Sequence, residues 1–201
     1  MISLYSVLGL EENSASTEVE TAHARLVQAF KSAQFSEGTT AHEQAGKCVR
    51  SIENAFQTLK TPELRRLYVE QRSEYLKGEK RGDTRPRLGQ LCVASGMISM
   101  EQLREAVEEQ IKNGMQLGEV LIQKKFISAA QLDGLLLGQE MIDVPSAVTE
   151  PTAVKLISLG LLTEDMGLIA QMEHRSLVLP IADIVARHGW VERDVLKILV
   201  A

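Results

Sequence analysis

The sequence has few residues of several kinds, and each scarcity excludes a class of protein. Cysteine occurs twice in 201 residues, as Cys48 and Cys92, and neither has a Cys or His nearby at the spacing of metal ligands. Both lie in apolar helical patterns, so we expect buried free thiols, a reducing compartment and no metal site. No apolar run approaches the roughly 20 residues that a membrane-spanning helix needs. The apolar start meets Glu11 and Glu12, which predicts a cytoplasmic chain with no secretory signal and no membrane insertion.

A basic surplus and the short motifs of common enzymes are absent as well. The net charge of −5 argues against a nucleic-acid partner. The sequence has no phosphate-binding loop of the Walker type and no Gly-x-Ser-x-Gly motif. Its histidines are scattered through helical patterns, at positions 23, 42, 174 and 188. We therefore expect no enzyme, no catalytic residue and no cofactor.

The residues that are present indicate a globular chain, 44% apolar and 24% charged. Charged residues, Gly and Pro replace the apolar periodicity over residues 73–86, which predicts a linker. We expect a small helical domain over residues 1–72 and a second helical domain over residues 87–201. The predicted fold class is all-α, with a basic linker that could dock on an acidic surface or serve as a solvated tether.

The first domain shows helical spacing in four segments. A short helix is expected around residues 4–8, a second beginning after an N-cap at Ser16, a third over residues 42–59, and a fourth starting at Pro62.

The N-terminal residues resemble a J domain. The resemblance lies in Tyr5-x-x-Leu8-Gly9-Leu10, in Glu18-Val19 with Ala22 and Leu26, and in Ile52-x-x-Ala55-Phe56-x-x-Leu59-x-x-Pro62-Glu63-x-Arg65-x-x-Tyr68. That family carries a His-Pro-Asp tripeptide that stimulates ATP hydrolysis by DnaK-type chaperones. Here Lys31-Ser32-Ala33 stands at the matching place. The resemblance therefore implies a J-like scaffold for docking, without co-chaperone activity.

The second domain contains an internal repeat. The segment that starts at Arg87 recurs from Gln116, an offset of 29 positions, and the pair recurs 64 positions further on. Each unit consists of a short helix, a turn, two apolar residues, a polar cap and a second helix. The units lie near 87–115, 116–145, 151–179 and 180–201, with turns at Gly96, Lys125, Gly160 and Gly189. Such units must stack on one another to bury their apolar faces.

Residues 87–139 resemble the MshEN domain, the N-terminal module of type II secretion ATPases. The family pattern takes 24 positions and occurs twice with a five-residue spacer, as in 87–110 and 116–139 here. The resemblance implies a receptor for cyclic di-GMP. The residue types suit that ligand, because an Arg can fork onto a guanine edge or a phosphate and a following Gly leaves room for backbone N–H groups.

The resemblance also implies which residues form the site. They are Arg87, Leu88, Gly89, Cys92, Val93, Gly96, Met97, Leu103, Val107 and Gln110 in the first copy, and Gln116, Leu117, Gly118, Leu121, Leu132, Leu136 and Gln139 in the second. The second copy departs from the pattern twice. Gln116 replaces the Arg, and Lys125 replaces the turn Gly, where a β-carbon disfavours the left-handed conformation.

Two functions remain open at this point. In the first, the chain is a bacterial second-messenger adaptor that binds cyclic di-GMP and relays it to a protein partner. In the second, the chain is a ligand-blind protein–protein adaptor with a decayed nucleotide site. The intact first motif and the preserved spacer favour the first; Gln116 and Lys125 favour the second. The family resemblance suggests a motility, pilus, secretion or biofilm system, and the sequence identifies neither the partner nor the oligomeric state.

Overall fold

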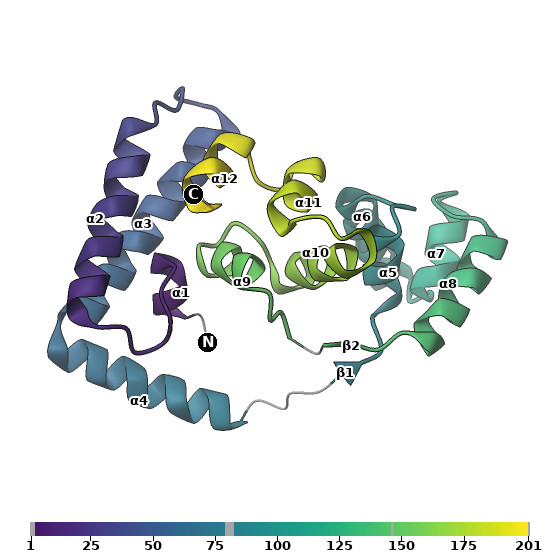
Figure 1. Cartoon of the computed structure of the whole chain (residues 1–201). Helices are drawn as coiled ribbons and strands as arrows, with labels where there is room; N and C mark the ends of the chain where they lie inside the picture. Colours follow the sequence, from purple (N-terminus) through teal and green to yellow (C-terminus); the bar gives the residue numbers. More distant parts are fainter. Residues whose placement is uncertain (1–2, 79–82, 146, 201) are drawn as a thin grey trace. The chain divides into compact units, whose positions relative to one another are not determined.

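The computed structural model describes residues 3–78, 83–145 and 147–200, and these form twelve helices and one pair of two-residue strands (Figure 1). The all-α fold class is thereby confirmed. The strands, β1 (Asp83–Thr84) and β2 (Val144–Pro145), pair antiparallel with Thr84 opposite Val144. None of the helices in these residues is both long enough and apolar enough to cross a membrane.

The helices follow one another with short connections. Their bounds are α1 Leu4–Leu8, α2 Ser16–Ser32, α3 Thr40–Lys60, α4 Pro62–Gly78, α5 Leu88–Ala94, α6 Met100–Asn113, α7 Leu117–Gln123, α8 Ala129–Met141, α9 Pro151–Ser158, α10 Glu164–Leu177, α11 Ile181–Arg187 and α12 Arg193–Val200.

Packing divides the chain into two compact units. The first, called unit 1, contains Met1–Lys80, Val148–Gly167 and Pro180–Ala201, and the second, called unit 2, contains Arg81–Ala147 and Leu168–Leu179. The predicted domain boundaries do not coincide with these units, because the third and fourth repeat units pack largely with the N-terminal helices. The division of the sequence at residues 72 and 87 stays a prediction.

Unit 1 is built on the antiparallel hairpin of α2 and α3, which lie side by side (Figure 1). Helix α1 packs on α3 and on α9, and α12 packs on both helices of the hairpin. The core contains fully buried side chains from all of these helices. Its largest members are Tyr5, Leu8, Leu26, Ile52, Leu59, Leu156, Leu159 and Ile184.

Polar contacts also join the N-terminal helices to the third and fourth repeat units. The Gln44 amide on α3 donates to the Trp190 carbonyl at 3.0 Å. The Lys155 ammonium on α9 ties the third unit to the fourth, since it donates to the Leu199 carbonyl at 2.6 Å, and it approaches the N-terminal part at 3.2 Å from the position a β-carbon on Gly9 would take. Burial lowers the pKa of Lys155, and the nearby Arg25 lowers it further. Buried polar groups with partners favour one docking geometry over others.

Two local predictions in the first eighty residues were wrong. The N-cap of α2 is Ala15 rather than Ser16, and the Glu18 carboxylate accepts the Ala15 N–H at 2.6 Å. Helix α4 extends to Gly78, so the first part of the predicted linker, Ser73–Gly78, is helical. No Pro or Gly interrupts α4 before Gly78, and its charged residues are as compatible with an exposed helix as with a tether. Residues 79–82 of the predicted linker lie outside the described residues.

The four turns of the repeat share one backbone conformation. Their central residues all have positive φ, at 72° for Gly96, 59° for Lys125, 73° for Gly160 and 69° for Gly189. In each turn the N–H of that residue donates to the carbonyl three positions earlier, at 2.9–3.1 Å. Lys125 thus adopts the left-handed conformation that its β-carbon disfavours, because the surrounding helices fix the turn.

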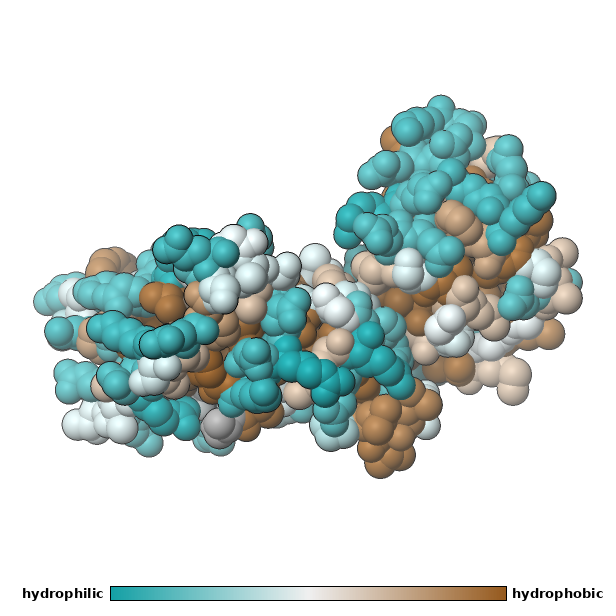
Figure 2. Space-filling view, turned by 90° about the horizontal axis from the view of Figure 1, so that it is seen from above, coloured by the Kyte–Doolittle hydropathy of each residue, from teal (hydrophilic) through white to brown (hydrophobic). Residues whose placement is uncertain are grey.

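Apolar residues also reach the surface. Figure 2 shows brown patches among the teal hydrophilic residues on the face it presents. The most exposed large apolar side chains among the described residues are Met141 at 85%, Val178 at 84%, Ile111 at 78% and Leu137 at 64%.

Candidate functional site

The two motif copies in unit 2 begin with the same backbone geometry. Arg87 precedes α5 with φ −69° and ψ 146°, and Gln116 precedes α7 with φ −72° and ψ 146°. Both residues are exposed. The helix after each copy is capped alike, because Ser99 accepts the N–H of Gln102 and Ser128 accepts the N–H of Gln131. The two copies are therefore one structural unit present twice.

A buried glycine follows the first leucine of each copy. A β-carbon on Gly89 would lie 2.7 Å from Leu103 Cδ1 and 3.5 Å from Leu117 Cδ2. A β-carbon on Gly118 would lie 2.9 Å from Leu132 Cδ2. The sequence interpretation gave these glycines the task of leaving room for a ligand. The structure gives that space to the leucines of the next helix, so helix packing is what the glycines permit here.

The two copies pack against each other reciprocally. Helix α6 packs on α7, α8 packs on α5, and α5 contacts α7. Exchange of the copies leaves this set of contacts unchanged, which is the pattern of a local two-fold relation. One hydrogen bond ties the end of the second copy to the start of the first, since the Gln139 amide donates to the Pro86 carbonyl at 2.7 Å.

The predicted site residues fall into three groups by exposure. The exposed residues are Arg87, Gly96, Met97, Val107, Gln116 and Leu136, and the partly exposed ones are Leu88, Leu103, Gln110, Leu117, Leu132 and Gln139. The buried ones are Gly89, Cys92, Val93, Gly118 and Leu121. Cys92, Val93 and Leu121 have no exposed surface, and burial raises the pKa of the Cys92 thiol to about 11. These three side chains shape the core beneath the site rather than its surface.

The two half-sites differ in charge by more than the Arg-to-Gln replacement. In the first copy the Arg87 N–H donates to the neutral Gln90 side chain at 2.9 Å. In the second copy the Gln116 N–H donates to the Glu119 carboxylate at 3.0 Å, and that acid is exposed. Sequence reasoning missed Gln90 and Glu119. The signal was present, because both stand at the third helical position, where a side chain caps the residue before the helix.

Two lysines stand in the second turn, Lys124 and Lys125, and they differ in how they could replace the positive charge that Gln116 lacks. Lys124 pairs with Glu105 at 2.8 Å, and this hydrogen bond raises the pKa of its ammonium group. Lys125 is exposed at the left-handed position of the turn. A cation is thus present beside the second copy, but it comes from the turn and not from the helix start.

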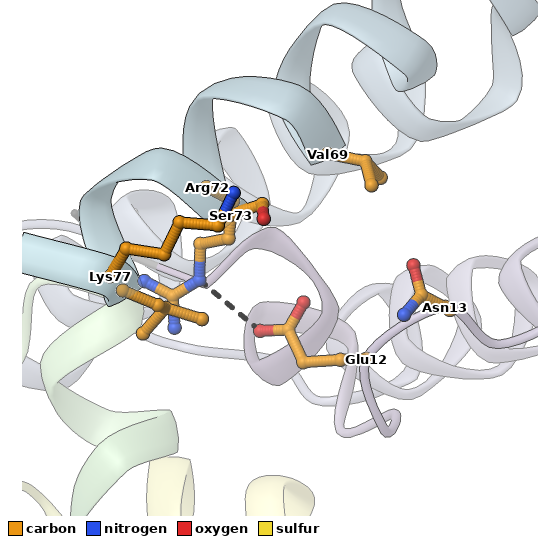
Figure 3. A pocket seen from close by; sticks show the side chains of 7 residues that line it. Glu12, Asn13, Val69, Arg72, Ser73 and Lys77 are labelled. Atoms are coloured by element: carbon orange, nitrogen blue, oxygen red, sulfur yellow. Dashed lines mark hydrogen bonds and ion pairs between the residues drawn. The ribbon is translucent and has the colours of Figure 1, made fainter.

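Two surface cavities lie in unit 1, away from the candidate site. No predicted site residue lines either of them. The first, of about 440 Å³, lies between the loop after α1 and the last turns of α4 (Figure 3). The Glu12 carboxylate there accepts hydrogen bonds from Arg72 Nε at 3.4 Å and Ser3 Oγ at 2.6 Å. The second, of about 450 Å³, is lined by Leu10, Thr17, Glu18, Thr21, Ala22 and Arg25.

Comparison with known proteins gives one partial similarity. No family model matches the chain, and no solved structure is similar to it. Over 74 residues the chain is 38% identical to the type IV pilus assembly ATPase PilB of Myxococcus xanthus strain DK1622. The matched part is 35% of this chain and 13% of PilB, so the chain spans a small part of that relative. The match fits the resemblance to secretion-ATPase N-terminal modules loosely, and no comparison supports the J-domain resemblance.

Proposed function

We propose that residues 87–139 bind cyclic di-GMP and that the chain is a non-enzymatic cytoplasmic adaptor that relays this ligand to a protein partner. The observation that carries the proposal is the reciprocal packing of two equivalent motif copies. Cyclic di-GMP is itself two equal halves, each with one guanine and one phosphate. A site with two structurally equivalent halves matches this symmetry of the ligand.

The first half-site has the chemistry for a guanine or a phosphate. The exposed Arg87 can form a bidentate, charge-assisted hydrogen bond. Met97 and Val107 expose 37% and 36% of their surface and offer apolar contact to a base. Loss of one charge-assisted hydrogen bond would cost about 1.5–3 kcal/mol, or roughly ten- to hundredfold in affinity.

The second half-site favours the alternative, a ligand-blind adaptor. Gln116 has no charge, and the exposed Glu119 beside it would repel a phosphate. An intact family site would present a cation at this place. If the chain binds the nucleotide, the first half-site supplies most of the affinity.

The similarity to a pilus assembly ATPase supports a pilus-related system for this adaptor. The matched part is too small a share of PilB to carry the activity of the whole relative. The partner is therefore proposed by class alone, as a protein of such a system.

Isothermal titration of the full chain with cyclic di-GMP tests the proposal, with GTP and cyclic di-AMP as controls. We expect saturable, guanine-selective binding that Arg87→Ala weakens by roughly ten- to hundredfold at unchanged helicity. Gln116→Arg with Glu119→Gln should strengthen binding, because the pair replaces a repulsive half-site with an attractive one. No binding by either the wild-type chain or this double variant would leave the ligand-blind adaptor as the function.

A further inference from the structure

Helix α8 exposes an apolar face on the side opposite its core contact. Leu135 is the buried residue of α8, and a helix turns about 100° per residue, so Leu137 points away from it. Four residues at spacings of four, three and four share this outward side, here called the outer α8 face: Ala130, Gly134, Leu137 and Met141. All four are exposed, Leu137 at 64% and Met141 at 85%. A surface helix normally carries polar residues on this side.

The internal repeat supplies a comparison within the same unit. Helix α6 is the counterpart of α8 at the offset of 29, and its outward residues at the same four positions are Glu101, Glu105, Glu108 and Lys112. The fold therefore tolerates charged residues at all four places. Packing within the repeat therefore does not explain why the outer α8 face is apolar. A contact with a molecule or segment outside unit 2 does explain it.

Gly134 is also consistent with a contact on the outer α8 face from outside unit 2. A β-carbon on Gly134 would meet no atom within 4 Å, so the interior of the molecule does not require a glycine there. A glycine inside a helix costs about 0.5–1 kcal/mol relative to alanine. A helix laid on the outer α8 face could approach the backbone closely at this position.

Charge along one edge indicates what kind of helix fits. Asp133 and Glu140 lie seven positions apart beside the apolar face, and both are exposed. Within the described residues neither carboxylate takes part in an ion pair. An antiparallel two-fold pairing of α8 with a second copy would bring both acidic edges to the same side, where they repel, and a parallel one would leave each acidic edge without a basic neighbour. A helix with basic side chains along its edge would neutralise them.

We propose that the outer α8 face is a docking surface for an amphipathic helix of a partner protein, one whose apolar stripe is edged with Lys or Arg. If the chain is an adaptor, this surface states which chemical features its protein partner must present. It is separate from the predicted nucleotide contacts of α8, since Leu132, Leu136 and Gln139 lie on other sides of the helix. Docking can therefore be measured without nucleotide, and its result does not depend on the proposed function.

A labelled helical peptide of Leu and Lys, with Leu on one face and Lys along the edges, serves as the probe. The measurement is fluorescence anisotropy with the full chain, and the same peptide with Glu in place of Lys is the control ligand. We expect saturable binding of the Leu/Lys peptide below about 100 µM and at least tenfold weaker binding of the Leu/Glu peptide.

Three variants locate the binding. Leu137→Gln with Met141→Gln should weaken binding at least about tenfold, because two exposed apolar side chains are removed. Asp133→Asn with Glu140→Gln should weaken it several-fold and reduce its dependence on salt. Ile111→Gln, a change at an equally apolar residue exposed by 78% on α6, should leave binding unchanged. The outward side of α6 is already polar, so Leu137→Gln and Met141→Gln should leave the circular dichroism spectrum unaltered.

Four results would overturn the proposal. They are no saturable binding of the Leu/Lys peptide, equal binding of both peptides, an equal loss in the Ile111 variant, or a dimer of the chain in sedimentation velocity that Leu137→Gln with Met141→Gln dissociates. The last would assign the outer α8 face to a second copy of the chain instead.

Discussion

Gln44 of α3 caps helix α12 from another part of the chain, because its amide oxygen accepts the N–H of Glu192 at 2.9 Å. In the first two repeat units a glutamine within the same helix does this, as Gln102 does for Ser99 and Gln131 for Ser128. In the fourth unit the corresponding residue is Val195, which has no polar group. The cap is therefore supplied across a separation of 148 residues.

Replacement of Gln44 should destabilise unit 1 measurably. Gln44→Ala removes two part-buried hydrogen bonds, one with the Glu192 N–H and one with the Trp190 carbonyl, at a cost of about 1–3 kcal/mol in the free energy of unfolding for the pair. Urea denaturation followed by circular dichroism measures this. The matched control is Gln57→Ala, which removes an exposed hydrogen bond to Glu53 and should change stability by less than about 0.5 kcal/mol. Equal effects of the two variants would mean that the cap contributes nothing.

The second turn of the repeat offers the opposite change, a gain in stability. Lys125 holds a left-handed φ of 59° at the position where the other three turns have glycine. Lys125→Gly should remove a strain of about 1–2 kcal/mol, which is the cost of the left-handed conformation for a residue with a side chain. Glycine also makes the unfolded chain more flexible, which cancels part of this gain, so we expect a net stabilisation of about 1 kcal/mol.

The neighbouring Lys124 is the control for that change. It has ordinary right-handed geometry with φ −75°, and it pairs with Glu105. Lys124→Gly should therefore destabilise the chain, and thermal denaturation followed by circular dichroism measures both variants. A loss of stability in both variants would show that the conformation at residue 125 is not strained.

Much of the repeat could be predicted from the sequence because its signals are local. The turn glycines, the paired apolar residues and the serine caps recur at fixed offsets, and each has a conformational reason within a few residues. Glycine at positions 96, 160 and 189 predicts a positive φ there, and all three residues have one. The helix–turn–helix form of all four units follows from these signals together.

The packing of the third and fourth units on the N-terminal helices could not be predicted in that way. Apolar periodicity indicates which face of a helix is buried but not which neighbour buries it. The contacts that decide the neighbour join distant residues, such as Gln44 with Glu192 and Ser51 with Leu159. The contacts between the two motif copies could not be predicted for the same reason. The approach of Leu117 to Gly89 and the hydrogen bond from Gln139 to Pro86 become visible only in the folded structure.

Two glycine substitutions should separate stability from ligand binding. A β-carbon on Gly89 displaces the end of the Leu103 side chain, whereas one on Gly134 meets open space. Gly134→Ala should stabilise the chain by about 0.5–1 kcal/mol through helix propensity. In Gly89→Ala the moved leucine offsets that gain, so we expect little net change in melting temperature and weaker cyclic di-GMP binding in titration. Unchanged affinity in Gly89→Ala would place the ligand away from Leu103.

The two buried thiols predict how the chain responds to alkaline pH. Burial raises the pKa of Cys48 to about 12 and that of Cys92 to about 11, from an ordinary 9.0. The folded chain therefore holds both protons more tightly than the unfolded chain does. The stability that this difference contributes is fully present below pH 9 and is lost as the pH rises toward 11 and 12, because unfolding then releases protons.

Thiol titration and alkaline denaturation measure the two consequences. Ellman's reagent at pH 8 should react with neither cysteine in the folded chain, since the thiolate is the reactive form, and with both in urea. The free energy of unfolding of the wild-type chain should fall more steeply between pH 9 and 11 than that of Cys48→Ala with Cys92→Ala. Rapid labelling of the folded chain, or parallel pH profiles for the two proteins, would show that these thiols reach solvent and have ordinary acidity.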